Sequence, residues 1–529
     1  MQSRASSWTV AGTAMASMLA FQPAAHAETP PGVLVVAQSI DDAVSFDPAE
    51  GFELTTVQTF NNVYQRLVQS DRDDGTKIDP ALAASWEIGP DGKSLVFALA
   101  PGAKFSSGNP VRPEDVIFSL SRAVKLNKTP AFILNELGWK ADTVDAQLTK
   151  VDDSHVKVTW TSDVGPAFVL AILTAPIASV VDAVTVAAKE KAGDFGNEWL
   201  KTNGAGSGAF TIKNYTPHEA LVLEANATAP GGAPKLKSII VRNVPDAAAR
   251  RLLVEQGDAD IVRGLGADQI TALKGKAGIQ VLAVPSARTD YLLINTKANA
   301  TLGNPAFWEA ARYLVDYDGI ANNLLQGQSQ VHQAFLPVGF PGAVTDTPFK
   351  LDVEHAKTVL RKAGIGKDLT IKFPVFNEAP FLQIAQSLQA TFGQAGIKLD
   401  IEPGVASEIY AKGRKGDYEI TLRYWIPDYF DPHSNASAFA INRDNSASTV
   451  AKQAGWIIPE ISDETAAAVK EQDPAKRAEL YGALQRKLQQ SSPYVFLLQG
   501  KDQVVLRAAV KGYAQGLNAD QVYYDKVEK

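Results

Sequence analysis

The stretch RYWIPDYFDP, residues 423–432, and the following His433 hold the side chains best suited to chemistry. Asp428, Asp431 and His433 are spaced closely enough to hold a metal ion, although the spacing matches no established metal motif. The two carboxylates could instead act as the acid and base of a hydrolase. A carboxylate beside aromatic rings that exclude water could also capture a cation. The residues alone leave these interpretations open, together with a surface loop whose rings pack into the core.

Aromatic residues flank Asp428 on both sides, and prolines interrupt the segment. Pro427 and Pro432 exclude a regular helix or a central strand across it, so we expect a loop. Aromatic walls around a carboxylate are typical of a recognition site. The candidate wall residues are Tyr424, Trp425, Tyr429 and Phe430.

The common enzyme signatures do not occur in the sequence. It contains no G-x-S-x-G motif, no phosphate-binding loop and no H-E-x-x-H motif. The S-x-x-K match at residues 154–157 begins an alternating strand, which argues against a catalytic Ser-Lys pair. Gly204, Gly206 and Gly208 lack the spacing of a dinucleotide-binding loop, and we interpret them as a tight turn. We therefore expect a protein without enzyme activity, cofactor or bound metal.

The elements that must position these residues alternate along the chain. Alternating apolar residues predict strands at residues 33–40 and 417–425, and the second strand runs into the candidate segment. Helical spacing predicts a helix over residues 55–68, and Pro113 in a first turn begins another. A chain of 529 residues is too long for one core. Strands alternating with helices therefore predict an α/β architecture with two or three lobes.

Composition and charge narrow the class of protein. Apolar residues form 45% of the chain, and a net charge of −7 without a basic run gives no footprint for nucleic acid. Residues 1–27 are typical of an export signal that ends at the small-x-small site Ala25-His26-Ala27. The chain has no cysteine, and therefore neither a disulfide nor the cysteine that a lipid anchor requires. We expect an exported, soluble protein of the Gram-negative periplasm that is not lipid-anchored.

Several ordered motifs identify a family. Residues 80–120 read PALAASWEIGPDGKSLVFALAPGAKFSSGNPVRPEDVIFSL, and GAGSGAF, EQGDADIV, LLINT, AARYLVDYDGI and AKTVLRKAGI follow in order. On these motifs the chain resembles the extracytoplasmic solute-binding proteins of the peptide/nickel-type (family 5) ABC importers, which include oligopeptide- and dipeptide-binding proteins. The resemblance covers essentially the whole chain after the signal. GAGSGAF departs from the family's usual Gly-Thr-Gly-Pro-aromatic sequence.

The resemblance implies a two-lobed clamshell, the periplasmic-binding-protein fold, with an extra α/β domain inserted in the first lobe. The first lobe would comprise residues 28–72, 200–285 and 490–529. The extra domain would comprise residues 73–199, and the second lobe residues 286–489. The solute would be trapped in the cleft between the lobes.

The resemblance also implies roles for individual residues. In peptide-binding members, an Asp in a W-x-x-D-x-x-[DE]-P loop binds the α-amino group of the peptide, and Asp428 occupies that position here. Arg423 is similar to a cleft arginine of some members, with an offset that differs by one residue. Phe52 and Glu53 match a first-lobe segment that faces the ligand. We expect these residues, together with the four aromatic wall residues, to bind the solute.

These observations predict a receptor for a peptide or a similar amine-bearing solute, which an inner-membrane ABC permease and its ATPases would import. We expect the receptor to be a monomer that does not bind nucleic acid. The same class of receptor carries opines, sugars, haem and metal chelates, so these solutes remain alternatives. A hydrolase that uses Asp428 and Asp431 as paired carboxylates is the hypothesis from a different class.

Overall fold

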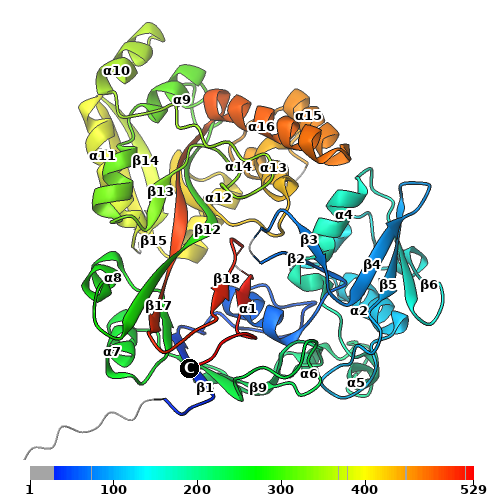
Figure 1. Ribbon diagram of the computed structural model, residues 1–529. Coiled ribbons are helices and arrows are strands. Elements are labelled where there is room, and N and C mark those ends of the chain that lie inside the picture. Colours follow the sequence, from blue (N-terminus) through cyan, green and yellow to red (C-terminus); the bar gives the residue numbers. More distant parts are fainter. Residues whose placement is uncertain (1–28, 73, 367, 378, 447–448, 519) are drawn as a thin grey trace, which may run out of the picture.

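The computed structural model of the protein (Figure 1) describes residues 29–529 except 73, 367, 378, 447–448 and 519. The predicted signal peptide, residues 1–27, lies outside the described residues. In the part that the structure describes, helices and strands alternate as predicted. None of its helices combines the length and the apolar character that a membrane crossing requires.

A nine-stranded sheet runs through the molecule and joins its two lobes. Its longest strands, β12 (Ile279–Ile294) and β17 (Tyr494–Arg507), pair antiparallel, and their register shifts twice between Pro285 and Tyr291. On one side of these shifts the pair joins strands of the first lobe, and on the other side it joins strands of the second lobe. The first-lobe strands are β11 (Ile261–Arg263), β1 (Val33–Gln38), β10 (Ser238–Asn243), β9 (Ala220–Ala225) and β8 (Phe210–Thr216). The second-lobe strands are β16 (Ile420–Trp425) and β13 (Ser329–Val331).

The first lobe is built around β1. This strand is apolar on both faces because it lies inside the sheet, paired in parallel with β10 and β11. Helices cover the sheet, and a C-terminal hairpin lies against the first of them. These elements are α1 (Leu54–Val63), α7 (Ala247–Gln256), α8 (Ala267–Leu273), β18 (Ala514–Gln515) and β19 (Val522–Tyr523).

A separate four-stranded antiparallel sheet, in the order β4-β5-β7-β6, lies beside the first lobe, at the right of Figure 1. Its apolar side chains, among them Phe97, share one core with Trp139 and the surrounding helices. We call this part the inserted unit; the boundaries predicted for the extra domain stay a prediction. A hairpin of β2 (Val68–Ser70) and β3 (Ile78–Pro80) leads into it. Its elements are β4 (Ala83–Ile88), β5 (Ser94–Leu99), α2 (Pro113–Leu126), α3 (Ala131–Asn135), η1 (Val144–Gln147), β6 (Leu148–Lys150), β7 (His155–Thr159), α4 (Pro166–Leu173), η2 (Pro176–Ala178), α5 (Ala183–Ala187) and α6 (Asn197–Leu200).

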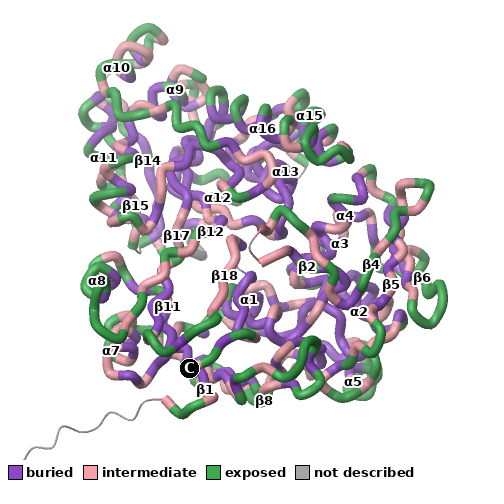
Figure 2. The backbone as a smooth tube through the Cα atoms, viewed as in Figure 1, coloured by how far each residue is buried: buried purple, intermediate pink, exposed green. Residues whose placement is uncertain are grey.

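The second lobe is mainly helical around a short parallel strand pair. Side chains cap two of its helices: Asn304 accepts a hydrogen bond from the Ala306 amide, and Asp352 accepts one from the His355 amide. Figure 2 shows buried backbone in the centre of this lobe and exposed residues along α10 at its outer edge. The elements are α9 (Pro305–Arg312), η3 (Gly319–Leu324), α10 (Val353–Lys362), β14 (Leu369–Phe376), α11 (Phe381–Gln394), β15 (Ile397–Gly404), α12 (Ala406–Lys415), α13 (Pro432–Ala440), α14 (Val450–Gln453), α15 (Pro459–Lys470) and α16 (Pro474–Ser491).

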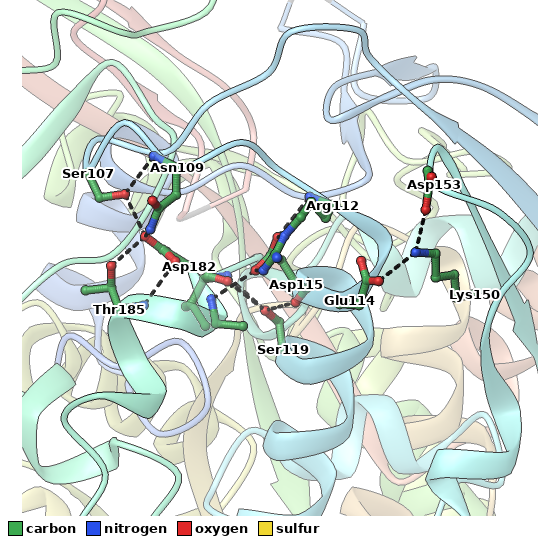
Figure 3. Close-up of polar contacts among 12 residues, drawn as sticks. Ser107, Asn109, Arg112, Glu114, Asp115, Ser119, Lys150, Asp153, Asp182 and Thr185 are labelled. Atoms are coloured by element: carbon green, nitrogen blue, oxygen red, sulfur yellow. Dashed lines mark hydrogen bonds and ion pairs between the residues drawn. The ribbon is translucent and has the colours of Figure 1, made fainter.

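Polar contacts fix α2 within the inserted unit (Figure 3). Asp115 in the first turn accepts hydrogen bonds from the backbone and side chain of Arg112, and its carboxylate also accepts one from the Ala183 amide. Asp182 accepts hydrogen bonds from Ser107 Oγ at 2.6 Å and from Asn109 Nδ2 at 2.9 Å. These contacts matter for the site because α2 leads directly into α3.

A buried ion pair connects α2 to the segment before α1. Both terminal nitrogens of Arg122 donate to Asp47 at 2.8 Å, and Asn197 Nδ2 also donates to this carboxylate at 2.7 Å. Paired and hydrogen-bonded in this way, the buried Asp47 carboxylate is fully compensated. The arrangement holds residues 47–53 in place next to the inserted unit.

Candidate functional site

The loop that carries Asp428 is fixed at both ends. The segment of residues 423–432 begins in the edge strand β16 and ends at the first residue of α13, so only residues 426–431 form the predicted loop. Pro432 does not prevent the helix, because proline is accepted in the first turn. Asp431 caps α13 by accepting a hydrogen bond from the His433 amide at 2.8 Å. Arg477 of α16 donates to both carboxylate oxygens of Asp431 at 2.7 and 2.8 Å. In the middle of the loop, the Asp428 amide donates to Ser434 Oγ at 2.9 Å.

Asp428 lines a cavity of about 420 Å³. Its carboxylate accepts no hydrogen bond and forms no ion pair with any residue that the structure describes. Burial raises the pKa of Asp428 from 3.8 to about 7. Asp428 is half-buried, and a carboxylate partly withdrawn from water without a partner is poised to receive a positively charged group.

Both lobes contribute walls to this cavity. Phe52 lies just before α1, Leu54 is the first residue of α1, Ile133 comes from α3, and Ile177 comes from η2. On the opposite side, the second lobe contributes its loop and the side chain of Tyr410 from α12. The second-lobe residues of the loop are Tyr424, Trp425, Ile426, Pro427 and Asp428. Four of the eight predicted site residues, Phe52, Tyr424, Trp425 and Asp428, are therefore brought together.

A second carboxylate at the cavity wall, Asp520, is compensated. It lies 3.5 Å from Arg66 Nη2, and Asn518 Nδ2 donates to it at 3.1 Å. Asp520 is also buried, and its pKa is raised by that burial while the Arg66 charge opposes the rise. Asp428 thus differs from Asp520 in having no cation beside it.

Tyr429 and Phe430 lie on the other side of the loop. The Tyr429 hydroxyl donates to Glu136 Oε2 at 2.9 Å, and its ring packs edge to face against Phe168. Phe430 packs on Phe340 with 4.2 Å between ring centres. Both aromatic residues line a smaller hollow next to the main cavity. They position the loop between the lobes, and a contact with the solute stays a prediction for them.

Arg423 and Glu53 are not among the described residues that line the cavity. The Arg423 guanidinium is buried, donates to the Ile409 carbonyl at 3.1 Å and lies 5.1 Å from the centre of the Tyr410 ring. Glu53 precedes α1 and accepts a hydrogen bond from the Phe52 amide at 3.1 Å. Each therefore supports a neighbour that does line the cavity.

The metal and hydrolase interpretations of Asp428, Asp431 and His433 do not fit the geometry. Asp431 faces Arg477 and not Asp428, so the two carboxylates do not act as a pair in the cavity. His433 is buried beside Tyr481 and Phe168, and burial lowers its pKa to about 4. Among the described residues, no group of three His, Cys, Asp or Glu side chains is close enough to hold a metal ion.

Sequence reasoning missed the walls that come from distant segments. Ile133, Ile177 and Asp520 line the cavity, but each lies more than 80 residues from both Asp428 and Phe52 along the chain. Tyr410 lies 18 residues before Asp428, on the separate helix α12. Ile133 and Ile177 look like ordinary core residues in the sequence. No local spacing could have assigned them.

A second cavity of about 500 Å³ lies beside the register shifts of the paired strands β12 and β17. Leu54 lines both cavities. Its wall carries charges of both signs, including Arg263, Lys501 and the ion pair of Arg288 with Asp290 at 2.8 Å. The Arg288 guanidinium lies 4.7 Å from the centre of the Tyr424 ring, which belongs to the first cavity. The two cavities are thus neighbours of different electrostatic character.

Comparison with known proteins places the fold. Residues 77–447 match the sequence model of the family described as bacterial extracellular solute-binding proteins, family 5 Middle. The chain is similar to the solved structure of the periplasmic binding protein DppA from Helicobacter pylori in complex with peptide STSA, with a TM-score of 0.77 and 23% identity. The similarity covers 94% of this chain and 98% of that chain. It is similar to HbpA2 from Haemophilus parasuis over 94% of this chain and 99% of that chain, with a TM-score of 0.79 and 23% identity. The prediction of a two-lobed α/β clamshell is confirmed.

Curated relatives extend this similarity along the chain. The chain is 29% identical over 506 residues to the probable D,D-dipeptide-binding periplasmic protein DdpA of Escherichia coli, with 95% of each chain covered. It is 25% identical over 472 residues to the dipeptide-binding protein of the same organism, with 85% of this chain and 86% of the relative covered. It is also 25% identical over 502 residues to heme-binding protein A of Haemophilus influenzae, with 91% and 90% covered.

Proposed function

Because this chain belongs to family 5 of the bacterial extracellular solute-binding proteins, we propose that it captures a peptide, or a similar solute with a cationic amine, at Asp428. The observation that carries the proposal is the uncompensated Asp428 carboxylate in a cavity walled by both lobes. An ammonium group placed there would supply the missing partner. The solute would thereby join the two lobes, since Phe52 and Leu54 face it from the first lobe and Trp425 from the second.

Energetics support one ionic contact as the main determinant of binding. A micromolar dissociation constant corresponds to about −8 kcal/mol. Removing one partner of a desolvated ion pair typically costs roughly 2–5 kcal/mol. A single Asp428–ammonium pair can therefore decide whether a solute is retained.

The names of the relatives favour a short peptide. Relatives at 29% and 25% identity are named for D,D-dipeptides and dipeptides. Heme-binding protein A has a similar identity of 25%. Haem carries propionates, and no Lys, Arg or His occurs among the described residues that line the Asp428 cavity. The charge of this cavity favours an amine over haem.

The family suggests the setting of this capture. We place the protein in the periplasm as a soluble receptor without a lipid anchor, and as a monomer that delivers its solute to an inner-membrane ABC permease with its ATPases. Closure of the lobes around the solute would present the form that the permease accepts. Light scattering of the purified protein tests the monomer, and crosslinking to the permease encoded beside it tests the partner.

Two measurements test the proposed capture. Native mass spectrometry of protein purified from its own host should reveal a trapped small molecule with an amine. Calorimetry should then show that Asp428→Asn weakens binding of that molecule, or of the dipeptide Leu-Ala, by tenfold or more. Asp417→Asn is the matched control, because Asp417 is an exposed second-lobe residue outside the cavity and the change in charge is the same. Equal affinity of Asp428→Asn and wild type would exclude the amine contact.

A further inference from the structure

Most of the wall of the Asp428 cavity is apolar, and its uncharged polar side chains are Asn518, Trp425, Tyr410 and Tyr424. Its charged members are Asp428 and Asp520, and Asp520 already lies beside Arg66 and Asn518. One negative charge is therefore left to be neutralised by the solute. A single ammonium group does this, and any further charge placed in the cavity would have no partner.

The hydrocarbon surface lies next to the carboxylate itself. Ile426 and Pro427 immediately precede Asp428, and both line the cavity, so they are within two residues of the charge. Ile133 and Ile177 line the same cavity from the inserted unit and are almost completely buried. The group attached beside a bound amine would therefore meet apolar atoms from both lobes.

We infer that the side chain next to the amine of the solute is apolar, so that the protein selects peptides or related amines with a hydrocarbon first residue. This inference rests on the proposed capture of an amine at Asp428. An anionic first side chain would lie near Asp428 without a cation on the wall, and a neutral polar one would exchange hydrogen bonds to water for contacts with a mainly apolar wall.

The selection applies to the amine end of the solute alone. Beyond Leu54, the neighbouring cavity has Arg263, Arg288 and Lys501 on its wall as well as acids. A polar or charged remainder of the solute can be accommodated there. The two cavities thus separate an apolar amine end from a polar remainder.

Three dipeptides of nearly equal shape test the inference: Leu-Ala, Asn-Ala and Asp-Ala. Calorimetry with the wild-type protein should show that Leu-Ala binds at least tenfold more tightly than Asp-Ala, with Asn-Ala between them. N-acetyl-Leu-Ala, measured in parallel, tests the amine contact separately and should not bind.

A charge variant tests the location. Leu54 is 50% exposed and lines the cavity, so Leu54→Lys adds a cation there without emptying the core. The preference for Leu-Ala over Asp-Ala should fall at least fivefold in this variant. Leu252→Lys is the control, because Leu252 is 51% exposed on α7 and lies outside the cavity; it should keep the wild-type preference.

The possible results separate the two proposals. If Asp-Ala binds within threefold of Leu-Ala while N-acetyl-Leu-Ala does not bind, the inference is wrong and the amine site stands. If N-acetyl-Leu-Ala binds as well as Leu-Ala, the amine contact is wrong. If none of the free dipeptides binds, the proposed capture of peptides fails, and the inference falls with it.

Discussion

The hydroxyl of Tyr429 donates a hydrogen bond of 2.9 Å to Glu136, and this bond joins the second lobe to the inserted unit. The Tyr429 ring belongs to the apolar core of that unit, where it meets Phe168. Tyr429 directly follows Asp428, which lines the cavity. One short loop therefore carries both the charge that faces the solute and a contact that holds the lobes together.

We predict that Tyr429→Phe weakens solute binding although it leaves the cavity wall unchanged. The variant keeps the ring but removes the hydrogen bond to Glu136, which leaves a buried carboxyl without its donor. Such a loss costs about 1–3 kcal/mol. The closed arrangement should become less stable, and we expect the dissociation rate of Leu-Ala to rise about tenfold. Stopped-flow fluorescence measures that rate.

Tyr215→Phe is the control for this prediction. The Tyr215 hydroxyl donates to the Ala43 carbonyl at 2.8 Å, entirely within the first lobe. This variant should lose a comparable hydrogen bond and some thermal stability, and it should keep the wild-type dissociation rate. Equal dissociation rates for wild type and Tyr429→Phe would show that the bond to Glu136 does not hold the lobes together.

The affinity for an amine should depend on pH through Asp428. Burial raises the pKa of this carboxyl to about 7, so at pH 5 the unliganded site is protonated and cannot pair with an ammonium group. Between pH 5 and 7 the peptide amine stays protonated, and we expect affinity for Leu-Ala to rise more than tenfold. At pH 6, binding should release about one proton, which calorimetry in buffers of different ionisation enthalpy measures.

The same shift fixes the sign for stability. The pKa of Asp428 in the folded protein is raised above its ordinary value of 3.8, so the folded state holds the extra proton between about pH 4 and 7. The contribution of this proton to the free energy of unfolding of the unliganded protein is therefore largest below pH 4. It is lost as the pH rises through 7. Asp428→Asn should show a smaller fall in melting temperature over that range and no proton release. Proton release that persists in Asp428→Asn would assign it to another group.

The two acids of the loop should respond to substitution in opposite ways. Asp431 is the buried partner of Arg477, and removing one partner of a buried ion pair costs roughly 3–5 kcal/mol. Asp431→Asn should therefore lower the unfolding midpoint in urea markedly. Asp428→Asn removes a partnerless charge, so its midpoint should equal or exceed that of the wild type. Equal midpoints for the two variants would contradict the distinction between a structural and a solute-facing carboxylate.

Local sequence patterns predicted many helices and strands, because the residues that determine each of these elements are neighbours in the sequence. The helix over residues 55–68 was predicted from apolar spacing and corresponds to α1, although α1 ends at Val63. The helix that begins at Pro113 was predicted from residue type and is confirmed as α2. The length of β12 was not predicted. This strand passes from one lobe to the other at its register shifts, and the sequence gives no local sign that the strand continues across them. Sheet continuity between lobes depends on pairing with β17, more than 200 residues away.

The site was predicted in part for the same reason. Asp428 was identified because charge and aromatic neighbours lie within one stretch, and the structure places it in a cavity. The stretch could not reveal that Asp431 faces Arg477, because that partner lies 46 residues further on. It also could not distinguish Arg423, which points behind the wall, from Trp425, which lies on it.

The glycines at 204, 206 and 208 were interpreted as a tight turn, and the structure gives a different reason for them. None of the three has a positive φ. Instead their backbone lies against the end of α1: a Cβ on Gly206 would lie 2.0 Å from the Val63 carbonyl oxygen, and one on Gly208 would lie 2.5 Å from the Asn62 carbonyl oxygen. Close backbone approach, and not a left-handed turn, therefore requires glycine here.

This close approach predicts that Gly206→Ala is severely destabilising. The added methyl group would meet backbone atoms of Val63, which cannot move aside as a flexible side chain can. Because Val63 ends α1 and Leu54 begins it, the displacement would also reach the cavity wall. We expect a loss of at least about 3 kcal/mol in the free energy of unfolding, measured in urea, together with weaker binding of Leu-Ala. Gly393→Ala in α11 is the matched control: no atom lies within 4 Å of its added Cβ, so the same substitution should leave stability equal or slightly higher. A Gly206→Ala protein as stable as Gly393→Ala would refute the packing requirement at this position.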